Sequence, residues 1–171
     1  MSTVYVISDS HYGHANLINK MKGPDGYPMR NFDSLETMNE HMVKAWNSVV
    51  TKRDVVYHLG DFCMGEKSLE FAGRLNGMKY LVMGNHDIHG AAKYLKYFNK
   101  LFGAAELHGY LLTHIPAHPD SVFPRYDGNI HGHLHGRQVG TPGYLGVSCE
   151  SVNYIPRTLE WCIKQLETQH A

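Results

Sequence analysis

Short, uninterrupted runs of apolar residues recur along the chain and predict the strands of a buried sheet. They occupy residues 4–7, 55–57, 80–83 and 110–112. A continuous apolar run of this length is typical of a strand that is covered on both faces. Residues 104–150 hold shorter strand candidates separated by Gly and Pro turns, which favours additional antiparallel pairing in the second half of the chain.

Between the first two runs, apolar residues spaced three and four positions apart predict an amphipathic helix. They are Leu35, Met38, Met42, Val43, Trp46 and Val49. Asp33 and Glu36 have the spacing of a capping box at its start. A similar apolar stripe after Pro156 predicts a last helix, and its members are Leu159, Cys162, Ile163 and Leu166. Residues 66–75 and 91–100 are further helix candidates.

The alternation of strands and helices predicts an α/β fold, with a largely parallel sheet and helices outside it. A length of 171 residues suits one domain, expected over residues 1–171. Lys plus Arg and Asp plus Glu both number 16, so no global field draws the protein onto nucleic acid or an acidic membrane. The three scattered cysteines fit a reducing compartment, and neither a signal-peptide pattern nor an apolar run of ~20 residues is present. The expected location is therefore cytoplasmic.

Each strand candidate leads directly into a cluster of polar side chains of metal-binding types. These clusters are residues 8–11, 58–61, 84–87, 113–114 and 131–136. They hold many of the 13 histidines, an unusually high number for 171 residues. In open α/β sheets, ligands bind beyond the carboxyl ends of the strands. We therefore expect the five clusters to meet in one place.

The side chains in these clusters supply at least seven nitrogen and oxygen ligands and no thiolate. This donor set suits Mn, Fe, Ni or Zn better than it suits a structural thiolate zinc site. Seven ligands exceed what one ion keeps while leaving room for a substrate. Two ions that share a carboxylate, as in phosphatases and nucleases with metals ~3.5–4 Å apart, are the simplest arrangement.

The order of these motifs resembles that of the calcineurin-like metallophosphoesterase superfamily, and their longer forms resemble its small single-domain members in bacteria and phages. The matching motifs are Asp9-Ser10-His11, Gly60-Asp61, Gly84-Asn85-His86-Asp87, His114 and Gly132-His133-Leu134-His135. The resemblance implies two packed β-sheets flanked by helices, whereas the apolar pattern alone predicts one sheet. The chain departs from the family after Asp61, where Phe62-Cys63-Met64 stand in place of a further polar residue.

The resemblance also implies a role for each matching side chain. Asp61 would bridge two metal ions, His86 would protonate the leaving group, and Asp87 would fix the His86 ring. The other ligands are Asp9, His11 and His135 for the first ion, and Asn85, His114 and His133 for the second. The implied cofactors are two divalent ions, with Mn as the first choice and Fe, Ni, Co or Zn as alternatives.

The implied reaction is hydrolysis of a phosphomonoester or phosphodiester by a hydroxide that bridges the two ions. Divalent cations lower the pKa of a bound water from ~15.7 toward neutrality, and an imidazole is suited to protonating the departing oxygen. The short chain leaves little room for a specificity domain, so we expect a small phosphate ester or a nucleotide-like substrate. Neither a membrane nor a long nucleic acid is an expected partner, and the oligomeric state stays open.

A few polar residues outside the motifs are candidates for contact with the substrate. His14 either binds the substrate phosphate or caps the next helix. Arg30, Arg125 and Arg137 are candidates for holding a second phosphate, because the guanidinium fork matches phosphate oxygens. Arg137 is favoured among them, since it lies two positions after His135.

Three other functions compete with a small-substrate hydrolase. A nuclease needs a basic track with stacking aromatics, and the neutral charge argues against it. A protein-binding scaffold on the same fold is expected to lack a ligand or the leaving-group histidine, yet His86 and every ligand are present. A metal-storage protein or a structural metal site predicts closed coordination without an open position.

Overall fold

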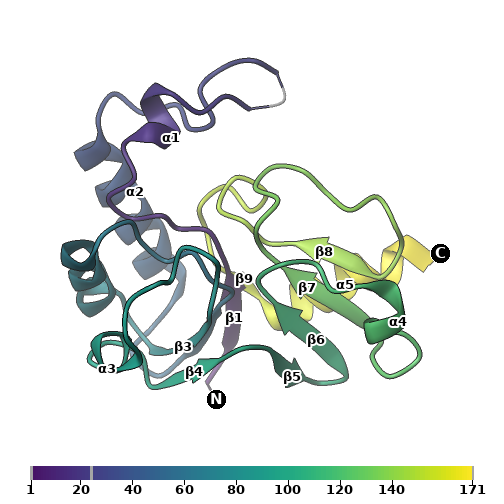
Figure 1. Ribbon diagram of the computed structural model, residues 1–171. Coiled ribbons are helices and arrows are strands. Elements are labelled where there is room, and N and C mark those ends of the chain that lie inside the picture. Colours follow the sequence, from purple (N-terminus) through teal and green to yellow (C-terminus); the bar gives the residue numbers. More distant parts are fainter. Residues whose placement is uncertain (1, 24, 171) are drawn as a thin grey trace.

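Two β-sheets lie at the centre of the computed structural model, which describes residues 2–23 and 25–170 (Figure 1). The first sheet has the order β4-β3-β2-β1-β9. Its strands are β1 (Val4–Ile7), β2 (Val55–His58), β3 (Met78–Val82), β4 (Lys100–Phe102) and β9 (Arg157–Thr158). Strands β1 to β4 pair in parallel, and β9 is antiparallel to β1. The predicted parallel sheet is thus confirmed for the first half of the chain.

The second sheet has the order β5-β6-β7-β8. Its strands are β5 (Ala105–Leu107), β6 (Tyr110–Thr113), β7 (Gly128–His131) and β8 (Tyr144–Gly146). The β5–β6 pair is antiparallel, whereas β7 is parallel to both of its neighbours. Two residues separate β4 from β5, so the chain changes sheets within one short link. The two-sheet fold implied by the family resemblance is confirmed, and the prediction of a single sheet is wrong.

Helices lie on the outer sides of the two sheets (Figure 1). They are α1 (Asn16–Asn19), α2 (Leu35–Val49), α3 (Ala91–Tyr94), α4 (Pro119–Val122), α5 (Leu159–Glu167) and the 3₁₀ helices η1 (Glu66–Arg74) and η2 (Thr168–His170). Helices α2 and α5 confirm the two amphipathic stripes. The helix expected over residues 91–100 ends at Tyr94, because the backbone N–H of Asn99 donates to the Lys79 carbonyl at 2.7 Å and the chain joins the sheet edge.

The N-terminus of α2 lies one residue later than the predicted capping box. Ser34, and not Asp33, is the N-cap. The Thr37 backbone N–H donates to Ser34 Oγ at 3.1 Å, and the Ser34 backbone N–H donates to Thr37 Oγ1 at 3.0 Å. This reciprocal pair satisfies two of the backbone donors that a helix start leaves free.

One hydrophobic core joins the two sheets. Val6 and Leu81 from the first sheet and Leu112 and Ile130 from the second are completely buried in the same cluster. Trp46 of α2 closes this core and donates from its indole nitrogen to the Asn76 carbonyl at 3.0 Å. The shared core holds the carboxyl ends of the parallel strands of both sheets close together. Within the described residues, no helix combines the length and the apolar character that crossing a membrane requires.

Candidate metal centre

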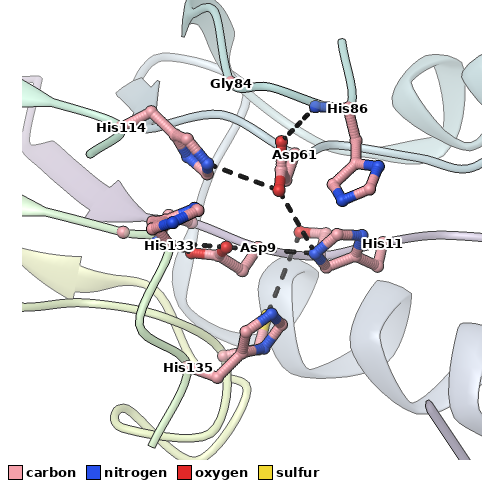
Figure 2. A network of polar contacts seen from close by, with 12 residues as sticks. Asp9, His11, Asp61, Gly84, His86, His114, His133 and His135 are labelled. Atoms are coloured by element: carbon pink, nitrogen blue, oxygen red, sulfur yellow. Dashed lines mark hydrogen bonds and ion pairs between the residues drawn. The ribbon is translucent and has the colours of Figure 1, made fainter. Parts of the chain in front are cut away.

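Polar side chains from five strand ends meet where the two sheets approach each other (Figure 2). Strands β1, β2 and β3 of the first sheet lead into this site, and so do β6 and β7 of the second sheet. The side chains they deliver are Asp9, His11, Asp61, Asn85, His86, His114, His133 and His135. The sequence clusters therefore converge as expected for ligands beyond the carboxyl ends of strands.

The first group of possible metal ligands consists of Asp9, His11 and His135. One donor atom from each residue lies within 4.8 Å of the other two. His11 Nε2 is 3.9 Å from Asp9 Oδ1, and the His11 and His135 rings stack with centroids 5.2 Å apart. These three residues follow β1 and β7, so the group forms only because the two sheets pack together.

The second group consists of Asp61, His114 and His133, whose donor atoms also lie within 4.8 Å of one another. His114 Nδ1 lies 2.8 Å from the Leu59 carbonyl, so this nitrogen carries the proton and Nε2 faces the site. His114 Nε2 is 3.3 Å from Asp61 Oδ2 and 2.9 Å from Asn85 Oδ1. The Asn85 amide oxygen thus adds a fourth donor beside this group.

Asp61 belongs to the second group and also contacts His11 of the first (Figure 2). Its Oδ2 is 3.3 Å from His114 Nε2 and 3.5 Å from His11 Nε2, and its Oδ1 accepts the His86 backbone N–H at 2.8 Å. Burial raises the pKa of Asp61, but the contacts with His114 and the His86 N–H outweigh burial and hold it at about 2. Gly84 makes this approach possible, because a side chain there would overlap the Asp61 carboxylate.

The donor set fits a pair of divalent cations. Both ring nitrogens of His11 are buried and have no hydrogen-bond partner among the described residues. Burial, followed by the charge of Arg30, lowers the pKa of His11 to about 2, so its imidazole is neutral and offers a lone pair. Burial also raises the pKa of Asp9, a desolvation cost that a bound cation would offset. Neutral imidazoles and carboxylates are the forms in which these side chains bind metals.

The backbone at this site adopts an unusual conformation. Five candidate ligands have positive φ: Asp9 (56°), His11 (49°), Asp61 (55°), His133 (69°) and His135 (53°). The described residues contain eight non-glycine positions of this kind, so most of them lie at the metal centre. Each costs on the order of 1 kcal/mol or more, and such strain concentrates at functional sites. The surrounding fold therefore holds these side chains in place against a local preference.

Comparison with known proteins agrees with this geometry. Residues 2–157 match the calcineurin-like phosphoesterase family. The chain belongs to this family. The uncharacterized protein MJ1445 of Methanocaldococcus jannaschii is 34% identical over 182 residues, which cover 98% of this chain and 93% of that protein.

Two further proteins are similar to this calcineurin-like phosphoesterase. The Gene 66 protein of Mycobacterium phage L5 is 36% identical over 93 residues, covering 51% of this chain and 41% of that protein. The structure is also similar to the crystal structure of AQ665, a protein of unknown function from Aquifex aeolicus. The TM-score is 0.74 at 27% identity, and the match covers 96% of this chain and 100% of the AQ665 chain. This structural similarity supports the two-sheet fold.

His86 and His14 lie beside the two groups without belonging to either. The exposed His86 ring is 5.4 Å from the His11 ring, centroid to centroid, and His14 lies 5.3 Å from His11 on the same measure. No side chain of the described residues caps helix α1, so the alternative in which His14 caps it is wrong. Both imidazoles therefore lie at the edge of the candidate metal centre.

Asp87 does not have the position expected of a partner for the His86 ring. Its buried carboxylate accepts three backbone N–H groups, from Asp61 at 2.7 Å, Gly84 at 2.8 Å and Phe62 at 3.1 Å. Both Asp87 carboxylate oxygens therefore bind backbone N–H groups, two of which belong to the turn that contains Asp61. The sequence places Asp87 beside His86, but the Asp87 side chain is buried whereas the His86 side chain is exposed.

We expect Asp87→Ala to destabilise the protein by about 2 kcal/mol or more, because it leaves two buried N–H groups and one partly buried N–H group without an acceptor. Urea denaturation followed by circular dichroism measures this change. The exposed Asp120→Ala is the matched control and should change stability by less than about 0.5 kcal/mol. Equal stability of the two variants would show that the Asp87 contacts contribute nothing to the fold.

The arginine candidates are separated by burial. Arg30 is buried and its guanidinium is engaged by protein groups, so the expectation that it grips a phosphate is wrong. Arg125 is exposed and lies over the Tyr126 ring, with Cζ 5.3 Å from its centroid. Arg137 lines a cavity of about 450 Å³ that His135 also lines.

The sequence motifs did not predict a role for Glu150, which contacts both Arg30 and His135, because no short-range pattern distinguishes it.

Proposed function

We propose that this calcineurin-like phosphoesterase hydrolyses phosphomonoesters or phosphodiesters with a pair of divalent metal ions. The observation that carries this proposal is the position of Asp61. Its Oδ2 lies within 3.5 Å of His11 Nε2, from the first group, and of His114 Nε2, from the second. A single carboxylate shared by two ligand groups is what a dinuclear centre requires.

The proposed ligands are Asp9, His11 and His135 for one ion, Asn85, His114 and His133 for the other, and Asp61 for both. When bound, the ions supply positive charge to the phosphate oxygens and acidify a water molecule so that it can attack phosphorus at neutral pH. Mn²⁺ is our first choice, because the donors are nitrogen and oxygen with no thiolate. The residues themselves would hold the ions, and the exposed His86 lies beside them, its ring centroid 5.4 Å from that of His11.

His86 is proposed as the proton donor to the leaving group. Its side chain is exposed at the edge of the centre, while its backbone N–H is anchored on Asp61 Oδ1 at 2.8 Å. Imidazole transfers protons effectively near neutral pH. His14 lies close by, with its ring centroid 6.5 Å from that of His86, and is proposed to contact the substrate phosphate.

A small phosphate ester or nucleotide-like molecule is the proposed substrate. The cavity of about 450 Å³ beside His135 is large enough for a group of that size, and both Lys22 and Arg137 line it. Neither cation forms an ion pair with another described residue. We propose that Arg137 contacts the part of the substrate that extends beyond the reacting phosphate.

A panel of substrates across several metals tests the proposed function. Protein stripped with a chelator should be inactive, and Mn²⁺ should restore hydrolysis of bis-aryl phosphate, aryl phosphate, or cyclic or linear nucleotides. Ni²⁺, Co²⁺, Zn²⁺ and Mg²⁺ complete the panel, and the ratio of diester to monoester turnover assigns the reaction class. Arg137→Ala should raise the KM of the best substrate and leave metal binding unchanged.

Two results would contradict the proposal. Absence of turnover on every ester with two ions bound would leave the binding-scaffold function. Turnover on a polynucleotide that falls steeply with salt, without turnover on mononucleotides, would favour the nuclease.

A further inference from the structure

Arg30 lies buried beneath the metal centre, with 1% of its surface exposed. Its guanidinium donates from Nη2 to the Asp9 carbonyl at 2.5 Å and from Nη1 to the Ser10 carbonyl at 2.7 Å. Its Nε donates to Glu150 Oε1, also at 2.7 Å, and Cζ lies 5.6 Å from the centroid of the Tyr154 ring. An enclosed guanidinium with these partners links the backbone after β1 to Glu150.

Glu150 connects this arginine to a candidate metal ligand. The same Oε1 that accepts from Arg30 lies 3.2 Å from His135 Nδ1, and the Glu150 side chain is 12% exposed. The next residue, Ser151, donates from Oγ to the His135 carbonyl at 2.9 Å. Consecutive residues therefore hold both the ring and the backbone of His135. An imidazole that donates from Nδ1 has its lone pair on Nε2.

We propose that Glu150 and Arg30 are positioning residues for the first metal group. Glu150 orients the His135 ring so that Nε2 faces the ion, and Arg30 fixes both Glu150 and the strained backbone at Asp9. This inference rests on the proposed function, since it requires the first group to bind a metal. Carboxylates behind metal-binding imidazoles fix the tautomer and raise ligand basicity, and losing one typically lowers affinity about 10–100-fold.

The proposed effect is confined to one of the two ions. In the second group, His114 Nδ1 forms its hydrogen bond with the backbone carbonyl of Leu59 and not with a carboxylate. The hydrogen bonds and ion pairs of Glu150 reach Arg30 and His135, and none reaches the second group. A change at Glu150 should therefore separate the affinities of the two ions.

Calorimetric titration of metal-free protein with Mn²⁺ tests this directly. Glu150→Met should lower the affinity of one ion about 10–100-fold and leave the other within about twofold. Glu150→Gln should show a smaller loss, because its amide oxygen can still accept from His135. The matched control is Glu40→Gln, which makes the same substitution in an exposed ion pair with Arg74, where the N–O distances are 2.6 and 2.7 Å.

A double-variant cycle shows whether Glu150 acts through His135. In the His135→Ala background, Glu150→Gln should cause no further loss of metal affinity, because the ring it orients is gone. Additive losses, or unchanged affinity in both Glu150 variants, would overturn the proposal. A general loss of folding would weaken both ions together, and circular dichroism of each variant detects it.

The tautomer of His135 gives a second readout on the unmodified protein. Long-range ¹H–¹⁵N spectra of the metal-free protein, recorded at a pH high enough to keep the His135 ring neutral, should show its single proton on Nδ1. A neutral ring with its proton on Nε2 would overturn the proposal. This measurement separates the two possible failures. If the native protein binds no second ion or hydrolyses no ester, the proposed function fails. If it does both while Glu150→Met binds the two ions normally, the positioning role alone is wrong.

Discussion

Asp61→Asn should lower phosphoester turnover by about 10³-fold or more and reduce the bound metal from two ions to one. The variant keeps the size of the side chain, and its amide oxygen can still accept the His86 N–H. It removes the negative charge between His11 and His114, where Oδ2 lies 3.5 and 3.3 Å from the two ring nitrogens. Steady-state kinetics together with elemental analysis of the metal-loaded protein measures both effects.

The control for this substitution is Asp33→Asn, which changes an exposed carboxylate far along the chain from the motifs. It should retain two ions and full turnover. If Asp61→Asn also keeps both ions and its activity, Asp61 does not bridge a metal pair and the proposed centre is wrong.

His86→Ala should lower turnover by about 10²–10⁴-fold while both metal ions stay bound. The imidazole side chain is exposed beside the centre and belongs to neither ligand group, so its removal takes away a proton donor and not a ligand. The loss should be larger for substrates with a basic alkoxide leaving group than for those with an acidic aryl leaving group, because only the former needs protonation. A comparison of the two substrate types measures this difference.

His118→Ala is a matched control, because the His118 side chain is 73% exposed and belongs to neither ligand group. Equal losses on both substrate types would assign His86 to substrate binding instead. Unchanged turnover would show that His86 takes no part in the chemistry.

Individual elements show how far local patterns reach. The apolar stripe predicted helix α2 and its buried face, because a helix presents one face to the core whatever surrounds it. The predicted N-cap was Asp33, whereas the structure has Ser34, because both residue types suit that position and the backbone conformation decides between them. Residues 95–100 have helical spacing, yet pairing with β3 draws the chain into a strand. Here the contacts with another part of the fold outweigh local preference.

For the metal centre too, the sequence predicted the candidate ligands but not the contacts of the residues around them. The order of the motifs from Asp9 to His135 marked the candidate ligands, because each follows a strand and carries a metal-binding side chain. No sequence motif predicted the contacts of the residues that surround those ligands. Asp87 adjoins His86 in sequence, but its carboxylate accepts the backbone N–H of Asp61. Arg30 was a candidate for binding phosphate, but its side chain is buried.

The amino-acid sequence by itself determined strands β1, β2, β3 and β6, the two main helices and the residue types at the ends of these strands, because these follow from periodicity and side-chain chemistry. Only the tertiary structure decided that the strands divide into two sheets, that Asp61 lies between His11 and His114, and that Glu150 supports His135. The physical reason is that hydrogen-bond direction and burial depend on residues more than 100 positions apart, such as Asp9 and His133. No local pattern along the chain records such contacts.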